Sequence, residues 1–122
     1  ADTVVALGRR VLPKAESEAE ARSCLARLSG RRHRVHGGLA VIAPDGRRSE
    51  RLTTTLVRFR RLEDAELEAY LDSGEWHGKA GGYAIQGRAA AFIPWINGSY
   101  SNVVGLALAE VDVVLRGLGF RR

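Results

Sequence analysis

This sequence of 122 residues contains no methionine, a single cysteine and no long apolar run. Because Cys24 has no partner cysteine in the chain, an internal disulfide is impossible, and a reducing compartment fits best. No apolar run approaches the roughly 18–20 residues that cross a bilayer, and no basic segment followed by an apolar one marks the chain for secretion. These absences exclude a disulfide-stabilised secreted domain and a membrane-spanning protein, and we expect a cytoplasmic protein.

The whole chain has a formal net charge of +5, and acidic residues are scarce in its first half. Residues 1–61 contain 14 Lys and Arg against 6 Asp and Glu, whereas residues 62–122 contain 5 against 8. Of the 19 basic residues, 17 are arginine, and they are spread over several predicted elements. Because no recognition helix or RNA-binding motif accompanies this charge, we interpret it as a solvated surface and expect nucleic acid not to be a partner.

Hydrophobic periodicity and turn residues predict seven elements in the order β-α-β-β-α-β-α. The expected strands are 4–7, 35–43, 51–59 and 89–93, and the expected helices are 17–28, 64–72 and a last one that buries Ala107, Val111, Val114, Leu115 and Leu118. Segment 44–46 (Pro-Asp-Gly) has the composition of a turn, and Gly30 and Gly74 are expected to end helices. This order predicts one α/β domain over residues 1–122, with a mixed sheet flanked by helices.

Several residues have side chains suited to a phosphorylated ligand. Lys14 and Lys79 are the only lysines, and both lie in loops flanked by proline or glycine, where an ammonium can reach a phosphate oxygen. Asp2, at the edge of an apolar strand, could bind a divalent metal or take a proton from water. Gln86 follows a glycine-rich loop and could both donate to and accept from a base edge. Each also has an ordinary alternative, as a surface lysine, a solvated aspartate or a turn.

The polar segment 97–105 leads directly into a helix, whose first N–H groups favour anions. Ser101 and Asn102 are also ordinary helix-capping residues, which is the simpler interpretation. Other chemistries lack the residues they need, because the three histidines and Cys24 show no zinc-binding spacing and no Gly-x-Ser-x-Gly pattern is present. Cys24 falls on the apolar face of the first expected helix, so we expect it in the core.

Taken in order, these segments resemble the Maf family, also called septum-formation-inhibitor proteins. Residues 1–5 (ADTVV) are similar to its catalytic-strand motif, and residues 28–33 are similar to its Leu-Ser-Gly-Arg-x-His turn. Residues 12–15 resemble its Leu-Gly-Lys-Pro segment, with departures at the second and fourth positions. Residues 79–87 resemble its Lys-Ala-Gly-Ala-Tyr-Gly-Ile-Gln-Gly motif, and residues 98–106 are identical to its final signature.

The resemblance implies a Maf/ITPase-like fold and a nucleoside triphosphate pyrophosphatase, which hydrolyses its substrate to NMP and pyrophosphate in a house-cleaning role. By this resemblance Asp2 is the proton acceptor that activates water. Lys14 and Lys79 face the triphosphate, and Thr3 and Gln86 set a preference for dTTP and UTP. The family requires a divalent cation, normally magnesium.

The family's Ser-x-Ser-Pro-Arg-Arg loop, which grips the phosphates, is not in this sequence. We therefore expect residues 1–122 to be the C-terminal two-thirds of the family's domain, incomplete at the N-terminus. Two alternatives stay open: a truncated remnant that binds nucleotide or a partner without turnover, and a basic nucleic-acid-binding domain. The sequence leaves the oligomeric state open, a homodimer included.

Overall fold

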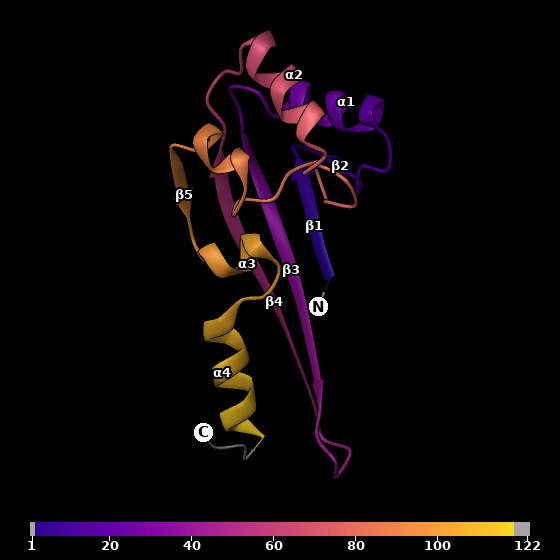
Figure 1. Ribbon diagram of the computed structural model, residues 1–122. Coiled ribbons are helices and arrows are strands. Elements are labelled where there is room, and N and C mark those ends of the chain that lie inside the picture. The colour runs from indigo at the N-terminus through magenta and orange to yellow at the C-terminus, as the bar shows by residue number, and fades with distance from the viewer. Residues whose placement is uncertain (1, 119–122) are drawn as a thin grey trace.

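A long antiparallel hairpin runs the length of the molecule, and the other elements are arranged along it (Figure 1). The structure is a computed structural model that describes residues 2–118. Its sheet has the order β2-β1-β3-β4-β5, and all four pairings are antiparallel. The strands are β1 (Asp2–Leu7), β2 (Arg10–Leu12), β3 (Arg32–Ile42), β4 (Arg48–Arg58) and β5 (Trp95–Asn97).

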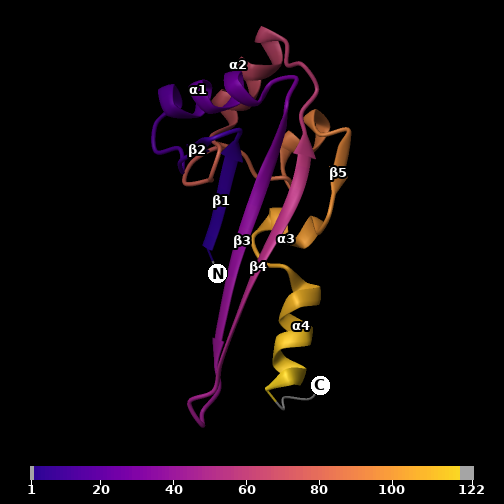
Figure 2. The same cartoon turned by 180° about the vertical axis from the view of Figure 1, so that it is seen from behind.

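The helices of the described chain lie at both ends and at the middle of the sheet. They are α1 (Glu18–Leu28), α2 (Asp64–Ser73), the 3-10 helix η1 (Arg88–Phe92), α3 (Tyr100–Val104) and α4 (Leu108–Gly117). Helices α1 and α2 pack together at one end of the sheet, while α4 lies beside the far half of the hairpin (Figures 1 and 2). The Ser17 side chain caps α1 by accepting from the Glu20 N–H, and Gly74 ends α2 in the left-handed conformation with φ 72°.

The main core lies where α1 and α2 meet one face of the sheet. Val5, Val35 and Val57 on three adjacent strands are each at most 2% exposed, and they share this core with the buried faces of both helices. Cys24 is 4% exposed on α1, which confirms its expected place in the core. A separate small cluster, made of Ala43, Val114 and Leu118, seats α4 against the end of the hairpin.

The α/β class with flanking helices is confirmed, and the expected helices and central hairpin are present. The strand predicted at 89–93 is wrong, because residues 88–92 form η1. Its three consecutive alanines have little strand propensity, and the short strand β5 begins only after Pro94. The expected mixed sheet is not found in residues 2–118, where every pairing is antiparallel; tight reversals at Gly8 and Gly46 produce two of these pairings.

Asn102 ties α3 to the middle of the sheet. Its side chain is 1% exposed, and Nδ2 lies 3.0 Å from Val35 O, 3.2 Å from Thr53 O and 3.1 Å from Thr55 Oγ1. Gly37 makes room for this amide, because a Cβ at that position would overlap Asn102 Oδ1. The buried amide therefore determines where α3 sits on β3 and β4.

The expectation that Asn102 caps a helix is wrong, since its side chain serves the sheet. Ser99 is the N-cap of α3, and its side chain accepts from the Asn102 N–H at 3.1 Å. Ser101 does cap a helix, but the following one: its Oγ accepts from the N–H of Leu108, the first residue of α4, at 3.0 Å. The polar segment is thus occupied with its own hydrogen bonds and with the sheet.

Replacing Gly37 by alanine should destabilise the chain, because the new methyl group would displace the Asn102 amide from its buried acceptors. We expect a loss of roughly 1–3 kcal/mol in the free energy of unfolding, the usual cost of overpacking a core, measured by urea unfolding. Gly38→Ala is the matched control, since its Cβ would lie 3.9 Å from the nearest atom, Asp2 O. Equal losses in the two variants would show that Asn102 does not impose the requirement for glycine.

Candidate active site

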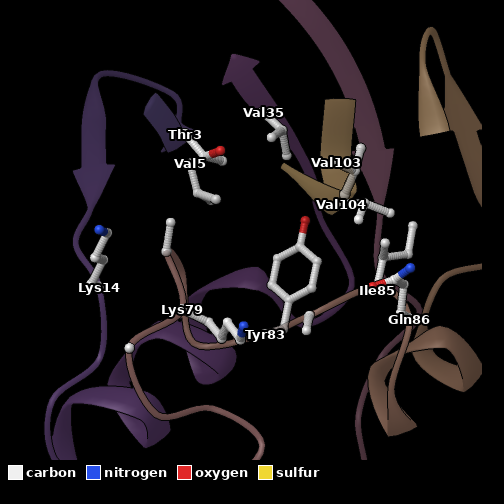
Figure 3. A pocket seen from close by; sticks show the side chains of 13 residues that line it. Thr3, Val5, Lys14, Val35, Lys79, Tyr83, Ile85, Gln86, Val103 and Val104 are labelled. Carbon is white, nitrogen blue, oxygen red and sulfur yellow. The ribbon is translucent and has the colours of Figure 1, made fainter. Parts of the chain in front are cut away.

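A pocket of about 200 Å³ opens between β1, β3, α3 and the loop that follows α2 (Figure 3). Its apolar wall is made of Val5, Val35, Ile85, Val103 and Val104, with the ring of Tyr83 standing among them. Its polar side chains are Thr3, Lys14, Lys79 and Gln86. Four of the residues singled out in the sequence, from three distant segments, therefore line one cavity.

Backbone hydrogen bonds join the two segments that carry the lysines. The Ala15 N–H donates to Lys79 O at 3.1 Å, the Gly78 N–H donates to Ala15 O at 2.8 Å, and Lys14 pairs with Ala80 in an isolated antiparallel bridge. Both lysine side chains are exposed, and neither forms an ion pair or hydrogen bond within residues 2–118. This pairing brings two unneutralised ammonium groups to one pocket although they are far apart in sequence.

Two glycines let the loop lie directly on the core. Gly81 and Gly82 have φ of 68° and 80°, a region that favours glycine. A Cβ on Gly81 would come within 3.0 Å of Val5, and one on Gly82 within 3.4 Å of Ala21. The buried Tyr70 hydroxyl donates to Gly82 O at 3.0 Å and holds the loop from below. The two glycines thus let the loop that carries Tyr83 and Gln86 pack closely against Val5 of β1 and Ala21 of α1.

Tyr83 is connected to a buried histidine. His33 on β3 is 2% exposed, and its Nε2 lies 2.6 Å from Tyr83 Oη. Burial lowers the pKa of His33 to about 4, so the imidazole is neutral at physiological pH. Burial also raises the pKa of the Tyr83 hydroxyl, which stays protonated. A neutral hydroxyl and a neutral imidazole therefore share this hydrogen bond under the pocket.

Asp2 is not brought into the pocket. It precedes Thr3 in β1, and consecutive side chains of a strand point to opposite faces of the sheet. Thr3 faces the pocket, whereas the exposed Asp2 borders a separate shallow hollow beside Gly38 and Arg51. The pocket lining itself contains no carboxylate.

Comparison with known proteins gives the family. The sequence profile of the Maf-like protein family matches residues 1–118. The chain belongs to this family. It is 66% identical over 121 residues to a dTTP/UTP pyrophosphatase of Granulibacter bethesdensis, which covers 99% of this chain and 57% of that protein. It is 65% identical over 120 residues to a dTTP/UTP pyrophosphatase of Paramagnetospirillum magneticum, covering 98% of this chain and 63% of that protein. The Maf-like chain thus spans roughly three-fifths of the length of these curated relatives.

Within the described residues of this Maf-like chain, neither a cluster of metal-binding side chains nor a membrane-spanning helix is found. Among residues 2–118 there is no group of three or more His, Cys, Asp or Glu side chains that could hold a metal ion. No described helix is both long and apolar enough to span a bilayer. The donor set of the pocket, two ammonium groups, a hydroxyl and an amide, does not fit a divalent cation, which prefers carboxylate oxygens.

Much of the arginine charge is balanced locally. Ion pairs with Asp or Glu involve Arg22, Arg47, Arg48, Arg51, Arg60, Arg88 and Arg116. Most of these pairs are well exposed and contribute little to stability, but each places a negative charge beside a guanidinium. By contrast, the two lysines at the pocket have no such neighbour among the described ion pairs.

Tyr83 and His33 are not among the site residues that the sequence predicts. In the sequence, His33 is one of three histidines without zinc-binding spacing, and residues 81–87 are notable for their glycines and Gln86. The two side chains are 50 positions apart, so no local pattern indicates their hydrogen bond. Both do fall within the motifs on which the family resemblance rests, which was the one available signal.

Acid should destabilise the chain partly through His33. Its pKa is 6.5 in an unfolded chain and about 4 when folded, so between these values the unfolded state binds a proton that the folded state does not. The contribution of neutral His33 to the free energy of unfolding is therefore fully present above pH 6.5, and about 3 kcal/mol is lost as the pH falls to 4. Urea unfolding at several pH values should show a shallower loss for His33→Gln than for the unchanged chain. Parallel pH profiles would contradict this account of His33.

Proposed function

We propose that the pocket of this Maf-like chain binds a pyrimidine nucleoside triphosphate, and that the chain acts in hydrolysing dTTP and UTP to NMP and pyrophosphate. The observation that carries the proposal is the common lining of Thr3, Lys14, Lys79 and Gln86, which supplies both cationic and base-pairing groups. Relatives that are 55–66% identical are named dTTP/UTP pyrophosphatases, which supports the same substrates here.

The triphosphate end of the ligand lies, in this proposal, against Lys14 and Lys79. Both ammonium groups are exposed and free of carboxylate partners in the described chain, so they keep their full charge for phosphate oxygens. The segments that carry them are hydrogen bonded through Ala15 and Lys79 and through Lys14 and Ala80, which places both lysines in the lining of one pocket. In this proposal each lysine contacts a different part of the triphosphate.

The base end lies, in this proposal, against the apolar wall, with Gln86 as its polar partner; Thr3 lies on the other side of the Tyr83 ring (Figure 3). Packing against Val103 and Ile85 removes the base from water, so that each polar atom of the base needs a protein partner. The Gln86 amide can donate to a carbonyl oxygen and accept from the adjacent ring N–H, an arrangement that uracil and thymine present. Cytosine has an acceptor in place of that N–H and an amine in place of one carbonyl, so it is mispaired with the amide held in this orientation.

The products NMP and pyrophosphate require water to break the anhydride between the α- and β-phosphates, by attack on one of these two phosphorus atoms. We keep Asp2 as the proposed proton acceptor on the resemblance of residues 1–5 to the Maf catalytic-strand motif and on its place next to the lining residue Thr3, although its side chain is on the other face of β1. A divalent cation, with Mg²⁺ the expected one, is best supplied on the triphosphate, since the pocket side chains do not fit it. We place the enzyme in the cytoplasm, where the buried free thiol of Cys24 stays reduced.

Two single variants should separate binding from chemistry. Lys79→Ala removes a phosphate partner, so UTP binding should weaken roughly 10-fold or more while uridine binding changes little. Asp2→Asn removes the proposed base, so UTP binding should persist while pyrophosphate release falls roughly 100-fold. Calorimetry with UTP and uridine, and pyrophosphate release in Mg²⁺, measure the two effects.

Each variant controls for the other in these assays. Equal losses of UTP and uridine binding in Lys79→Ala would mean that Lys79 supports the loop and does not contact phosphate. Unchanged turnover in Asp2→Asn would remove Asp2 from the mechanism. Nucleotide binding by the unchanged chain without any pyrophosphate release would favour the non-catalytic alternative.

Base preference should depend on Gln86. Because a mispaired buried polar group costs about 1–3 kcal/mol, UTP and dTTP should be preferred over CTP by roughly 10- to 100-fold. Gln86→Glu should erode this preference, since a carboxylate accepts hydrogen bonds but does not donate. Binding constants for UTP, dTTP, CTP and ATP, compared between the unchanged chain and the variant, measure the preference. A chain that binds CTP or ATP as tightly as UTP would show that Gln86 does not read the base.

A further inference from the structure

His33 does not line the pocket, yet it is bonded to a residue that does. Its Nε2 lies 2.6 Å from Tyr83 Oη, and the two rings meet edge to face with their centroids 5.5 Å apart. Phe59 contacts both rings in the same manner, at 5.3 Å from His33 and 4.9 Å from Tyr83. Figure 3 shows the Tyr83 ring among the lining side chains, with its hydroxyl pointing toward Val35 and Val103. Tyr83 is thus held by both its ring and its hydroxyl.

The histidine leaves one buried nitrogen without a partner. Within residues 2–118, His33 Nδ1 is the single buried side-chain nitrogen or oxygen that makes no hydrogen bond. A neutral imidazole has one N–H, so with Nε2 bonded to Tyr83 either the proton or the lone pair of Nδ1 stays unpaired in each tautomer. An apolar ring would fill this place without that cost. Stability of the core therefore does not explain a histidine here, whereas the bond to Tyr83 does.

Tyr83 begins the segment that presents Gln86 to the pocket. The Gln86 side chain is exposed and makes no hydrogen bond within the described chain, so its amide is aimed only by the backbone that carries it. That backbone is held by the buried side chains of Tyr83 and Ile85, and by the Gly87 N–H, which donates to Ala84 O at 3.1 Å. Of these anchors, Tyr83 is the one with a polar bond to the sheet.

We propose that His33 is a positioning residue for base recognition, which fixes segment 83–87 through Tyr83 Oη and so aims the Gln86 amide. The inference rests on the proposed function, in which Gln86 reads the base. A recognition group must be held within about 0.5 Å of its productive place by residues that do not touch the ligand. His33, buried on the rigid strand β3, is in a position to do this for a loop that has no regular structure of its own.

The decisive variant replaces both partners, His33→Phe together with Tyr83→Phe. It keeps both rings and their edge-to-face packing, and it removes the unpaired nitrogen together with the hydrogen bond. Because both polar partners disappear, its urea unfolding midpoint should be unchanged or higher than that of the unaltered chain. Its affinity for UTP should nevertheless fall roughly 10-fold while that for CTP stays constant, so that the preference for UTP is reduced. His33→Gln retains an acceptor for the Tyr83 hydroxyl and should retain most of the preference.

Hydrogen exchange provides a measurement that needs no nucleotide. In the double variant the Gly87 amide should exchange roughly 10-fold faster, because segment 83–87 has lost its polar anchor. The Ser29 amide, bonded to Leu25 O at the end of α1, is the internal control and should not change. A stably folded double variant with unchanged Gly87 exchange and an unchanged UTP preference would overturn the role of His33. An unaltered chain without UTP preference would contradict the proposed function alone, and Gly87 exchange would then still decide whether His33 fixes the segment.

Discussion

The hydroxyl of Thr55 and the side-chain amide of Asn102 hold α3 and the turn before it on the sheet. Thr55 is fully buried, and its Oγ1 accepts from the Ser99 N–H and from Asn102 Nδ2, both at 3.1 Å, while donating to Ser99 O at 3.3 Å. Asn102 also donates to the Val35 carbonyl on the next strand. Because a buried polar group without a partner is costly, α3 has one favourable position on β3 and β4. Gly37 and Gly98 fit the same constraint, since a side chain on either would press on Asn102 or Thr55.

The position of α3 on the sheet determines one wall of the pocket. Val103 and Val104 directly follow Asn102, and they form the wall that faces the Lys79 loop. Across the cavity, the position of the loop that carries Lys79 depends on the close approach of Gly81 to Val5. Both walls are therefore packed on the same sheet. One is held by the buried amide of Asn102, and the other lies close to Val5 because Gly81 has no Cβ. Loosening either contact would alter the width of the pocket without changing any residue that touches a ligand.

Sequence reasoning succeeded where the signal was local. Gly74 indicated the end of α2, and the Pro-Asp-Gly turn indicated the central hairpin. The two hairpin strands begin about three residues earlier than expected, because their limits depend on the pairing of β3 with β4 and not on composition. Residues 89–93 misled for the opposite reason, because an apolar run between glycine and proline suits a strand or a buried turn equally, and the low strand propensity of three alanines favours the turn.

The site itself could not be assembled from spacing. Lys14 and Lys79 meet because loop backbones pair across a gap of 65 positions, and only the family resemblance anticipated that they would share a site. The bond between His33 and Tyr83 had no counterpart in the sequence analysis, because neither residue belongs to a pattern that predicts contact. The opposite orientation of Asp2 and Thr3 follows from the alternation of a strand, yet the motif they share suggests a single location.

The two ends of the pocket make different physical demands on the chain. At the exposed lysine end, charge acts over several ångströms and tolerates small shifts, so affinity there depends on charge and little on exact placement. At the apolar end, a hydrogen bond at Gln86 strengthens as water is excluded, but it fails when the amide is misplaced by a fraction of an ångström. The side chains of Lys14, Lys79 and Gln86 are all exposed, but the segment that carries Gln86 rests on buried rings and a buried imidazole. In the proposed function, discrimination between bases depends on these buried contacts, so selectivity can be lost through residues that never contact the nucleotide.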